Sequence, residues 1–187
     1  MNRPAGNLLG LPWRLGFGLQ DSGWVLRAEI VWDKEFARPE SVTNRVTRVH
    51  EHIFMLTMRA TNYHYNQDAT RVPVKRTYSN LGKQKDGVLR RDLDRDYRVL
   101  NNPMGRNGTS VWRCIRRSHE GDHAATMPLE LAQWMLGASC DDNAVVCDQF
   151  GGAGMTALAA VRLGYRAISI DFDPKATAEA IERLRHG

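Results

Sequence analysis

The sequence feature that most constrains the fold is the stretch Val145–Thr156 (VVCDQFGGAGMT) near the C-terminus. A short apolar run ends at Asp148, a glycine-rich turn follows, and an Ala/Leu-rich segment comes next. That order is typical of a strand, a tight loop and a helix. A second apolar run, Ile168–Ile170, ends at Asp171. Acids at the ends of neighbouring strands in an open α/β sheet can accept hydrogen bonds from ribose hydroxyls. We therefore predict half of a site for a nucleoside cofactor.

The spacing of the glycines narrows the class of cofactor. Dinucleotide sites favour Gly-x-Gly-x-x-Gly, whereas Gly152-Ala153-Gly154 is followed by Met155-Thr156-Ala157 without a third glycine. The pattern favours a mononucleoside such as S-adenosylmethionine. A tight turn without a ligand is the alternative, because glycines after a strand often have that role alone.

Size and composition indicate one globular domain. The 187 residues contain 42% hydrophobic and 25% charged side chains, which is ordinary for a folded domain. The three cysteines form no Cys-x-x-Cys pair, so neither a disulfide framework nor a zinc knuckle is indicated. Cys147 lies in an apolar run, and we expect it to be buried. We recognise no signal peptide and no membrane-spanning run, and we expect a cytoplasmic protein without a membrane partner.

Positive charge gathers in the middle of the chain. Residues 59–119 hold fourteen Lys/Arg and five Asp/Glu, although the net charge of the whole chain is only +5. Tyrosines and Trp112 are interleaved with these basic residues, a combination that suits nucleic acid through phosphate pairing and stacking. A solvated loop of mixed charge is the alternative. The candidate DNA-binding residues are Lys75, Arg76, Arg90, Arg91, Arg116 and Arg117.

Periodicity and turn signals predict the regular elements, with residues 59–120 as an irregular basic insertion. In the first part we expect a helix over Leu8–Asp21 and strands over Val25–Trp32 and His52–Met58. The second strand is apolar on both faces, so we expect both faces to be buried. A further helix begins at Pro128 and ends before Gly137. A parallel β-α-β-α unit follows, with strands at 143–148 and 166–171 and helices at 155–163 and 174–185.

Several short blocks occur in the order found in one enzyme family. They are Leu11–Arg14, Leu19–Trp24, Ile30–Lys34, Pro39–Val42, His50–Leu56, Ser110–Trp112 and His123–Pro128. Together with the glycine loop, these blocks resemble the site-specific DNA amino-methyltransferases of bacteria and phages. The resemblance is to the N4-cytosine/N6-adenine enzymes of the β-type motif order. It covers residues 8–187, most weakly in the basic middle.

The resemblance implies a fold and an activity. The fold would be the α/β, Rossmann-like fold of S-adenosylmethionine-dependent methyltransferases, as a single domain. In that domain, residues 1–58 belong to the catalytic subdomain, 59–120 to target recognition in double-stranded DNA, and 121–187 to cofactor binding. The activity would be methyl transfer from S-adenosylmethionine to an exocyclic amine of cytosine or adenine.

The resemblance also implies roles for individual residues. Asp171 would bind the ribose, and Trp32 and Lys34 would lie near the flipped target base. Gln149 and Met155 depart from the family loop, which has Pro and Thr there. The residues expected to line the cofactor site besides Asp171 are Thr126, Met127, Pro128, Asp148, Phe150, Gly152, Gly154 and Thr156.

One family element is missing from this sequence. The catalytic tetrapeptide Asp/Ser-Pro-Pro-Tyr/Trp does not occur, because the chain contains no Pro-Pro pair. We therefore identify no catalytic residues and expect an incomplete sheet in a C-terminal part of a methyltransferase. Such a part would be one product of a split gene, completed by an upstream fragment, or a decayed remnant. The alternative function is a non-catalytic DNA-binding remnant or specificity partner. An RNA or small-molecule methyltransferase would share the glycine loop but not the blocks around Trp32 and His50.

No metal site is predicted. His50-Glu51-His52 would place two imidazoles on one face of a strand without a third ligand. His119 and His123 lie in a polar segment without nearby cysteines.

Overall fold

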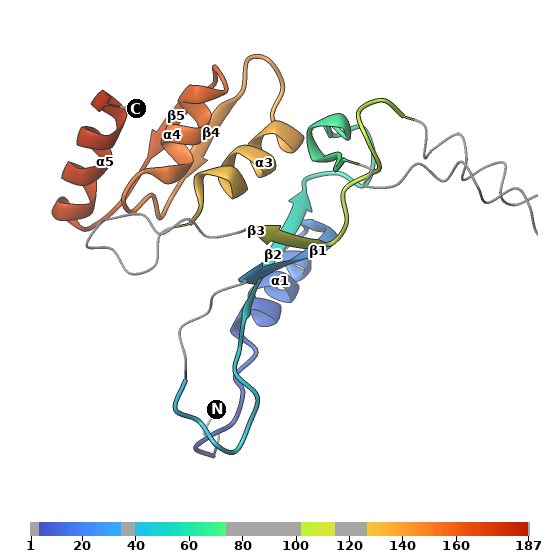
Figure 1. Ribbon diagram of the computed structural model, residues 1–187, viewed down its shortest axis with the longest axis vertical. Coiled ribbons are helices and arrows are strands. Elements are labelled where there is room, and N and C mark those ends of the chain that lie inside the picture. The colour runs from blue at the N-terminus through green and yellow to red at the C-terminus, as the bar shows by residue number, and fades with distance from the viewer. Residues whose placement is uncertain (1–3, 35–39, 74–101, 115–126, 187) are drawn as a thin grey trace, which may run out of the picture. The chain divides into compact units, whose positions relative to one another are not determined.

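The computed structural model describes residues 4–34, 40–73, 102–114 and 127–186 (Figure 1). These residues belong to two compact units. The first unit draws on Met1–His64 and Thr109–Pro128, and the second on Tyr65–Gly108 and Leu129–Gly187. Each unit is described by itself below. Among the described residues, no helix is both long and apolar enough to cross a membrane.

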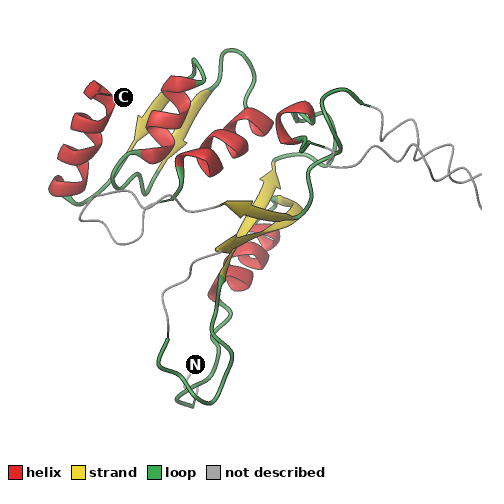
Figure 2. Cartoon of the chain, viewed as in Figure 1, coloured by secondary structure: helices red, strands yellow, loops and turns green. Residues whose placement is uncertain are grey.

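The first unit is a small sheet with one helix packed on it. It comprises α1 (Leu11–Asp21), β1 (Val25–Lys34), β2 (His50–Thr57) and β3 (Val111–Cys114). The strand order is β2-β1-β3, with β1 antiparallel to β2 and parallel to β3. Figure 2 shows α1 beside these strands.

Helix α1 begins later than predicted, at Leu11 rather than Leu8. Gly10 has a φ of 62°, a left-handed conformation that cannot continue a helix backwards and that favours glycine. The helix packs through Trp13, whose ring centroid lies 5.1 Å from that of Phe54 on β2. A Cβ added to Gly16 would lie 3.5 Å from the Phe54 ring, an ordinary contact distance, so this position of α1 also faces β2.

The prediction that β2 is buried on both faces is wrong. Seven of its eight residues are only half-buried and the remaining one is exposed. Within the described residues, β2 has a strand partner on one side alone, β1, and α1 covers one face. β2 therefore carries more apolar side chains than the first unit buries.

Strand β3 was not predicted from the sequence. It lies inside the segment expected to be irregular, and it pairs in parallel with the end of β1, with Val31 opposite Val111 and Lys34 opposite Cys114. The chain thus returns to the first unit after the residues that belong to the second.

The second unit contains the predicted β-α-β-α arrangement, which is confirmed. Its elements are η1 (Asp68–Thr70), α3 (Leu129–Ser139), β4 (Val145–Asp148), α4 (Met155–Arg162), β5 (Arg166–Ser169) and α5 (Pro174–His186). β4 and β5 are parallel. Helix α3 continues through Gly137, where a helix end was predicted, and a Cβ at Gly137 would lie 3.4 Å from Ala69 of η1. Gly137 therefore lies inside α3, facing η1, and does not end the helix.

The two-stranded sheet is covered by helices on one face. Val146 is buried, and Ala167 is paired with it in the register. The core between α3 and α4 is formed by fully buried side chains, among them Leu131, Ala132, Ala159 and Ala160.

The opposite face of the β4–β5 sheet is open. Val145 is 47% exposed and Ile168 is 53% exposed, and Cys147, expected to be buried, is exposed as well. The expectation for Cys147 failed because the apolar run predicts a strand but not how many faces of the sheet are covered. Within the described residues β4 pairs with β5 alone, which agrees with an incomplete sheet.

Candidate cofactor-binding site

The glycine turn closes the carboxyl edge of the β4–β5 sheet. Pairing continues past the strands, because the Ile170 N–H donates to the Asp148 carbonyl at 2.8 Å and the Gly151 N–H donates to the Ile170 carbonyl at 2.9 Å. Gly152 and Gly154 have φ values of 49° and 78°, in the left-handed region that favours glycine. Helix α4 begins directly after Gly154. The turn is therefore a fixed corner between β4 and α4.

Two carboxylates flank this turn, one following each strand. The Asp148 carboxylate accepts a hydrogen bond from the Phe150 N–H at 3.0 Å. The Asp171 carboxylate accepts hydrogen bonds from the N–H groups of Gly152 and Asp173, both at 2.8 Å. The backbone donors of Asp173 and then Gly152 hold the pKa of Asp171 below its ordinary value of 3.8. Asp171 is therefore ionised at neutral pH and joins the turn to the end of β5.

The hydrogen-bonding groups of the turn and of its two carboxylates indicate which ligands this site can bind. The N–H groups of Phe150, Gly151, Gly152 and Gly154 all donate to acceptors within the turn or at the strand ends. A pyrophosphate cradle needs free N–H groups, so the turn fits that ligand poorly. An ionised carboxylate offers about four acceptor positions, more than the turn itself uses. The site therefore fits a ligand that donates hydrogen bonds, as ribose hydroxyls and an ammonium group do.

Helix α5 supports the turn from behind, which sequence reasoning missed. A Cβ added to Gly154 would lie 2.7 Å from the Cβ of Ala180, so the turn packs directly on this helix. The Arg183 guanidinium donates to the Ala153 carbonyl at 2.5 Å and contacts the Met155 sulfur at 3.2 Å. The sequence signal was weak, because an arginine on an amphipathic helix usually faces solvent.

Two aromatic side chains next to the carboxylates are open to solvent. Phe150 is 86% exposed and Phe172, directly after Asp171, is 96% exposed. Phe172 was not among the predicted site residues. Exposed rings beside hydrogen-bond acceptors suit a ligand with a flat face, such as a purine. Thr156, in the first turn of α4, is half-buried.

The structure brings six of the predicted cofactor residues together in the second unit: Asp148, Phe150, Gly152, Gly154, Thr156 and Asp171. Met127 and Pro128 directly precede α3 and are assigned to the first unit. Thr126 lies outside the described residues, as do the DNA-binding candidates Lys75, Arg76, Arg90, Arg91, Arg116 and Arg117.

The two base-pocket candidates lie in the first unit and contact each other. Trp32 is only 8% exposed, and the Lys34 ammonium lies 4.7 Å from the centroid of its ring. Lys34 also forms an ion pair with Glu51, which lies opposite Trp32 in the register. A cation–π contact and an ion pair together restrict the position of the lysine.

The two histidines of β2 contact each other, and His52 also contacts β1. The Nδ1 atom of His52 lies 2.6 Å from the Glu29 carboxylate, and the His50 ring lies 5.1 Å from the His52 ring. In the part of the chain that the structure describes, no group of three or more His, Cys, Asp or Glu residues is placed to hold a metal ion.

Comparison with known families decides the family of this chain. Residues 4–182 match the N6/N4 methyltransferase family model, which is described as DNA methylase. The chain belongs to this family. The turn with its two acids therefore lies in a DNA methylase chain, as the resemblance implied.

Individual DNA methylases show the same likeness. The Type II methyltransferase M.Cfr9I of Citrobacter freundii is 34% identical over 179 residues, which cover 96% of this chain and 51% of the relative. The structure described as the cytosine-N4-specific PvuII DNA methyltransferase superposes with a TM-score of 0.69 at 14% identity, covering 98% of this chain and 60% of that one. The M1.HpyAVI–SAM complex superposes with a TM-score of 0.62 at 17% identity, covering 95% and 70%. The chain thus spans about half the length of the curated relative named here.

Proposed function

We propose that this chain is the cofactor-binding and DNA-recognising part of a DNA amino-methyltransferase that uses S-adenosylmethionine. The observation that carries the proposal is the pair of carboxylates, Asp148 and Asp171, beside the glycine turn at the carboxyl ends of β4 and β5. Ligands of open α/β sheets bind at that edge. Membership of the DNA methylase family gives the reaction class.

In this proposal each residue near the turn has a separate task. Asp171 accepts hydrogen bonds from the ribose hydroxyls, while Asp148 accepts from a donor of the methionine part. The faces of Phe150 and Phe172 lie beside the adenine. Gly152, Gly154 and Thr156 keep the turn close to the ligand, and Thr126, Met127 and Pro128 contact the methionine end. S-adenosylmethionine, when bound, supplies a methyl group on a sulfonium, so the protein mainly binds and orients the reactants.

We propose that the first unit contacts the flipped DNA base. Trp32 and Lys34 lie together on β1, and we assign them to the pocket of the flipped cytosine or adenine. Lys34 is already oriented by Trp32 and Glu51, so its ammonium needs little reordering on binding. Within the basic stretch 59–119, we assign six residues to contacts with double-stranded DNA: Lys75, Arg76, Arg90, Arg91, Arg116 and Arg117.

A second polypeptide segment is proposed to complete the active site. The sequence holds no Pro-Pro pair, and the family tetrapeptide would supply the acceptors that orient the target amine. Within the described residues β4 has one unpaired edge, which gives such a segment a strand to pair with. The open face around Val145 and Ile168 gives it an apolar surface to cover. The relative M.Cfr9I comes from a bacterium, and DNA of bacteria lies in the cytoplasm, where we propose that the complete enzyme acts.

Methyl transfer from tritiated S-adenosylmethionine to DNA tests the proposal. The assay is run on this chain alone and on this chain with a polypeptide encoded upstream that carries Pro-Pro-Tyr or Pro-Pro-Trp. We expect transfer only in the second case. DNA binding without transfer in both cases would favour the alternative, a non-catalytic DNA-binding remnant or specificity partner.

Calorimetry tests cofactor binding separately. Asp171→Ala should weaken S-adenosylmethionine binding by about tenfold or more, because a hydrogen bond to a charged acceptor contributes about 1.5–3 kcal/mol. Asp142→Ala is the matched control, since this exposed carboxylate of the same unit lies before β4. Equal affinity in the two variants would refute the ribose assignment.

A further inference from the structure

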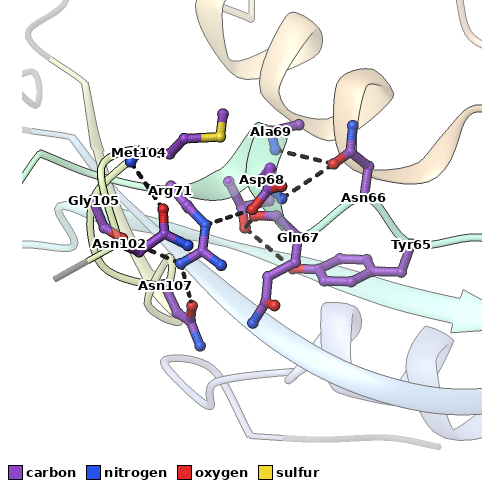
Figure 3. Close-up of polar contacts among 11 residues, drawn as sticks. Tyr65, Asn66, Gln67, Asp68, Ala69, Arg71, Asn102, Met104, Gly105 and Asn107 are labelled. Carbon is purple, nitrogen blue, oxygen red and sulfur yellow. Dashed lines mark hydrogen bonds and ion pairs between the residues drawn. The ribbon is translucent and has the colours of Figure 1, made fainter. Parts of the chain in front are cut away.

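Arg71 ties together two chain segments that are far apart in sequence (Figure 3). Its Nε donates to the Asp68 carboxylate at 2.5 Å. One terminal nitrogen of the guanidinium donates to the Gly105 carbonyl at 3.2 Å and to the Asn107 side-chain oxygen at 2.8 Å. We call this set of four residues the Arg71 clamp. It joins residues 65–73, the first arm, to residues 102–108, the second arm.

The two arms are in direct backbone contact beside the clamp. Val72 and Arg106 exchange both of their N–H···O=C hydrogen bonds, at 2.9 and 3.0 Å. A Cβ at Gly105, whose φ is 101°, would lie 2.2 Å from the Val72 carbonyl oxygen. A Cβ at Gly108 would lie 2.5 Å from the carbonyl oxygen of Thr70. The arms therefore meet at glycines because no side chain fits between them.

The Arg71 side chain is largely buried, and the first arm is anchored on helix α3. Only 11% of the Arg71 side chain is exposed, against 51% for Asp68. The Asn66 N–H donates to the Ala138 carbonyl near the end of α3 at 2.8 Å, and the Asn66 side chain accepts from the N–H groups of Asp68 and Ala69. Figure 3 shows Asn66 and Arg71 on opposite sides of η1. The arms are thus fixed to the unit that carries the glycine turn.

The sequence between the arms explains why such a clamp matters. Residues 74–101 contain eight Lys/Arg and four Asp. Because Val72 and Arg106 are hydrogen-bonded to each other, the described residues that flank this segment lie side by side. Closing a loop costs conformational entropy. When the two flanking arms are already joined in the folded chain, this entropy is lost during folding, and it need not be lost again when a polyanion binds.

We propose that Arg71 is a positioning residue for DNA binding: the Arg71 clamp holds the ends of the basic segment on the cofactor-binding unit. This inference rests on the proposed function, since it takes DNA as the partner of that segment. Arg71 itself does not contact the DNA. Its guanidinium is committed to Asp68, Gly105 and Asn107, and its effect on DNA is transmitted through the two arms.

Two substitutions separate positioning from charge. Arg71→Ala removes the charge and the clamp, whereas Arg71→Lys keeps the charge but lacks the planar fork that reaches three acceptors. If Arg71 acts by positioning, both variants bind DNA about tenfold more weakly than the unaltered chain. If Arg71 acts by charge alone, Arg71→Lys binds as the unaltered chain does, and the inference is overturned.

Arg185→Ala is the matched control. Arg185 also pairs with a carboxylate three residues away, Glu182, and it belongs to the same unit, but it is 67% exposed and joins no second segment among the described residues. Arg185→Ala should change DNA affinity by less than about twofold. Should Arg71→Ala fail to fold, Asn107→Ala removes one acceptor of the clamp, keeps the guanidinium and is expected to weaken DNA binding in the same direction.

Fluorescence anisotropy of a labelled mixed-sequence duplex, titrated at several salt concentrations, gives the decisive measurement. The slope of log K against log salt falls by about 0.9 for each phosphate that the protein no longer neutralises. We expect a fall equivalent to more than about two phosphates in both Arg71 variants, because the two arms that flank the basic segment are no longer joined by the clamp. A fall equivalent to about one phosphate in Arg71→Ala, with none in Arg71→Lys, would overturn the inference.

Amide hydrogen exchange distinguishes failure of this inference from failure of the proposed function. In both Arg71 variants the N–H groups of Val72 and Arg106 should exchange about tenfold faster or more, since local opening governs their protection, while S-adenosylmethionine affinity stays unchanged. An unaltered chain that binds DNA, with variants that bind equally well, contradicts the inference alone. An unaltered chain that neither binds DNA nor transfers methyl groups when completed refutes the proposed function, and the DNA part of the inference with it.

Discussion

The Arg183 guanidinium of helix α5 donates a hydrogen bond to the Ala153 carbonyl in the middle of the glycine turn. This contact crosses 30 residues of sequence and connects the last helix of the chain to the candidate cofactor site. The turn is therefore held from two sides, by Asp171 after β5 and by Arg183 from α5.

Replacing Arg183 should weaken cofactor binding indirectly, through the turn that it supports. Arg183→Met keeps most of the side-chain volume but leaves the Ala153 carbonyl without its charged donor, an effect of about 1.5–3 kcal/mol on the turn. We expect S-adenosylmethionine to bind about tenfold more weakly by calorimetry. Arg185→Met, two residues further along α5 and exposed, is the control. Equal affinities in the two variants would show that the turn does not need this support.

Substitution by alanine should lower the free energy of unfolding by different amounts at the two left-handed glycines, Gly152 and Gly154. At Gly152 an alanine meets open space, with the Phe150 carbonyl 4.0 Å away, so only the left-handed conformation is penalised, by about 1–2 kcal/mol. At Gly154 the methyl would meet Ala180 at 2.7 Å, and overpacking adds about 1–3 kcal/mol. Urea unfolding of Gly152→Ala and Gly154→Ala measures the difference.

A rescue experiment identifies the source of the Gly154 penalty. Ala180→Gly removes the colliding methyl group from α5, at a helix-propensity cost of about 1 kcal/mol. The double variant Gly154→Ala/Ala180→Gly should be more stable than the sum of the two single effects predicts. Strict additivity would mean that α5 moves away and that the contact is not restrictive.

The Asp171 carboxylate should make stability depend on pH in the acid range. Its pKa is lower in the folded chain because backbone N–H groups of Asp173 and Gly152 donate to the ionised form. Its contribution is therefore complete above the ordinary value of 3.8, and it is lost as the pH falls through the lower folded value. The difference in thermal midpoint between the unaltered chain and Asp171→Asn should stay constant from about pH 7 to 5 and shrink below about pH 4. A difference that grows on acidification would contradict the assignment.

The open face of the β4–β5 sheet should be needed for methyl transfer with the upstream polypeptide but not for the stability of the chain. Ile168 is 53% exposed, and surface substitutions usually change stability by less than about 0.5 kcal/mol. We expect Ile168→Ser to leave the urea midpoint almost unchanged and to reduce methyl transfer in the presence of the upstream polypeptide. Ile181→Ser, at a similarly exposed position of α5 (46%), is the control and should leave transfer intact.

The elements set by local signals were predictable from the sequence. The helix predicted at 174–185 begins at Pro174, and the Asp173 carboxylate before it accepts from the Lys175 N–H at 2.9 Å. The apolar runs before Asp148 and Asp171 likewise predicted β4 and β5, and the family followed from the order of short blocks. These features depend on neighbours within a few residues, so a single sequence contains them.

Features that depend on distant residues were not predictable. Strand β3 has four residues, and its partner β1 lies about eighty positions earlier in the chain. The prediction for Cys147 failed because the helices cover one face of its strand alone within the described residues. Arg71 and Arg183 gave no local sign of their roles, since a single arginine shows its acceptors only after the chain has folded.

The hydrogen-bonded pair Val72–Arg106 also bears on how such a chain can evolve. Whatever lies between these two residues begins and ends at a fixed point, so its length and composition can change without moving the strands on either side. A longer loop costs little extra entropy, about 0.6 kcal/mol for each doubling. On the proposed function, homologous exchange between Val72 and Arg106 would then transfer a new DNA preference into a scaffold that keeps its glycine turn unchanged.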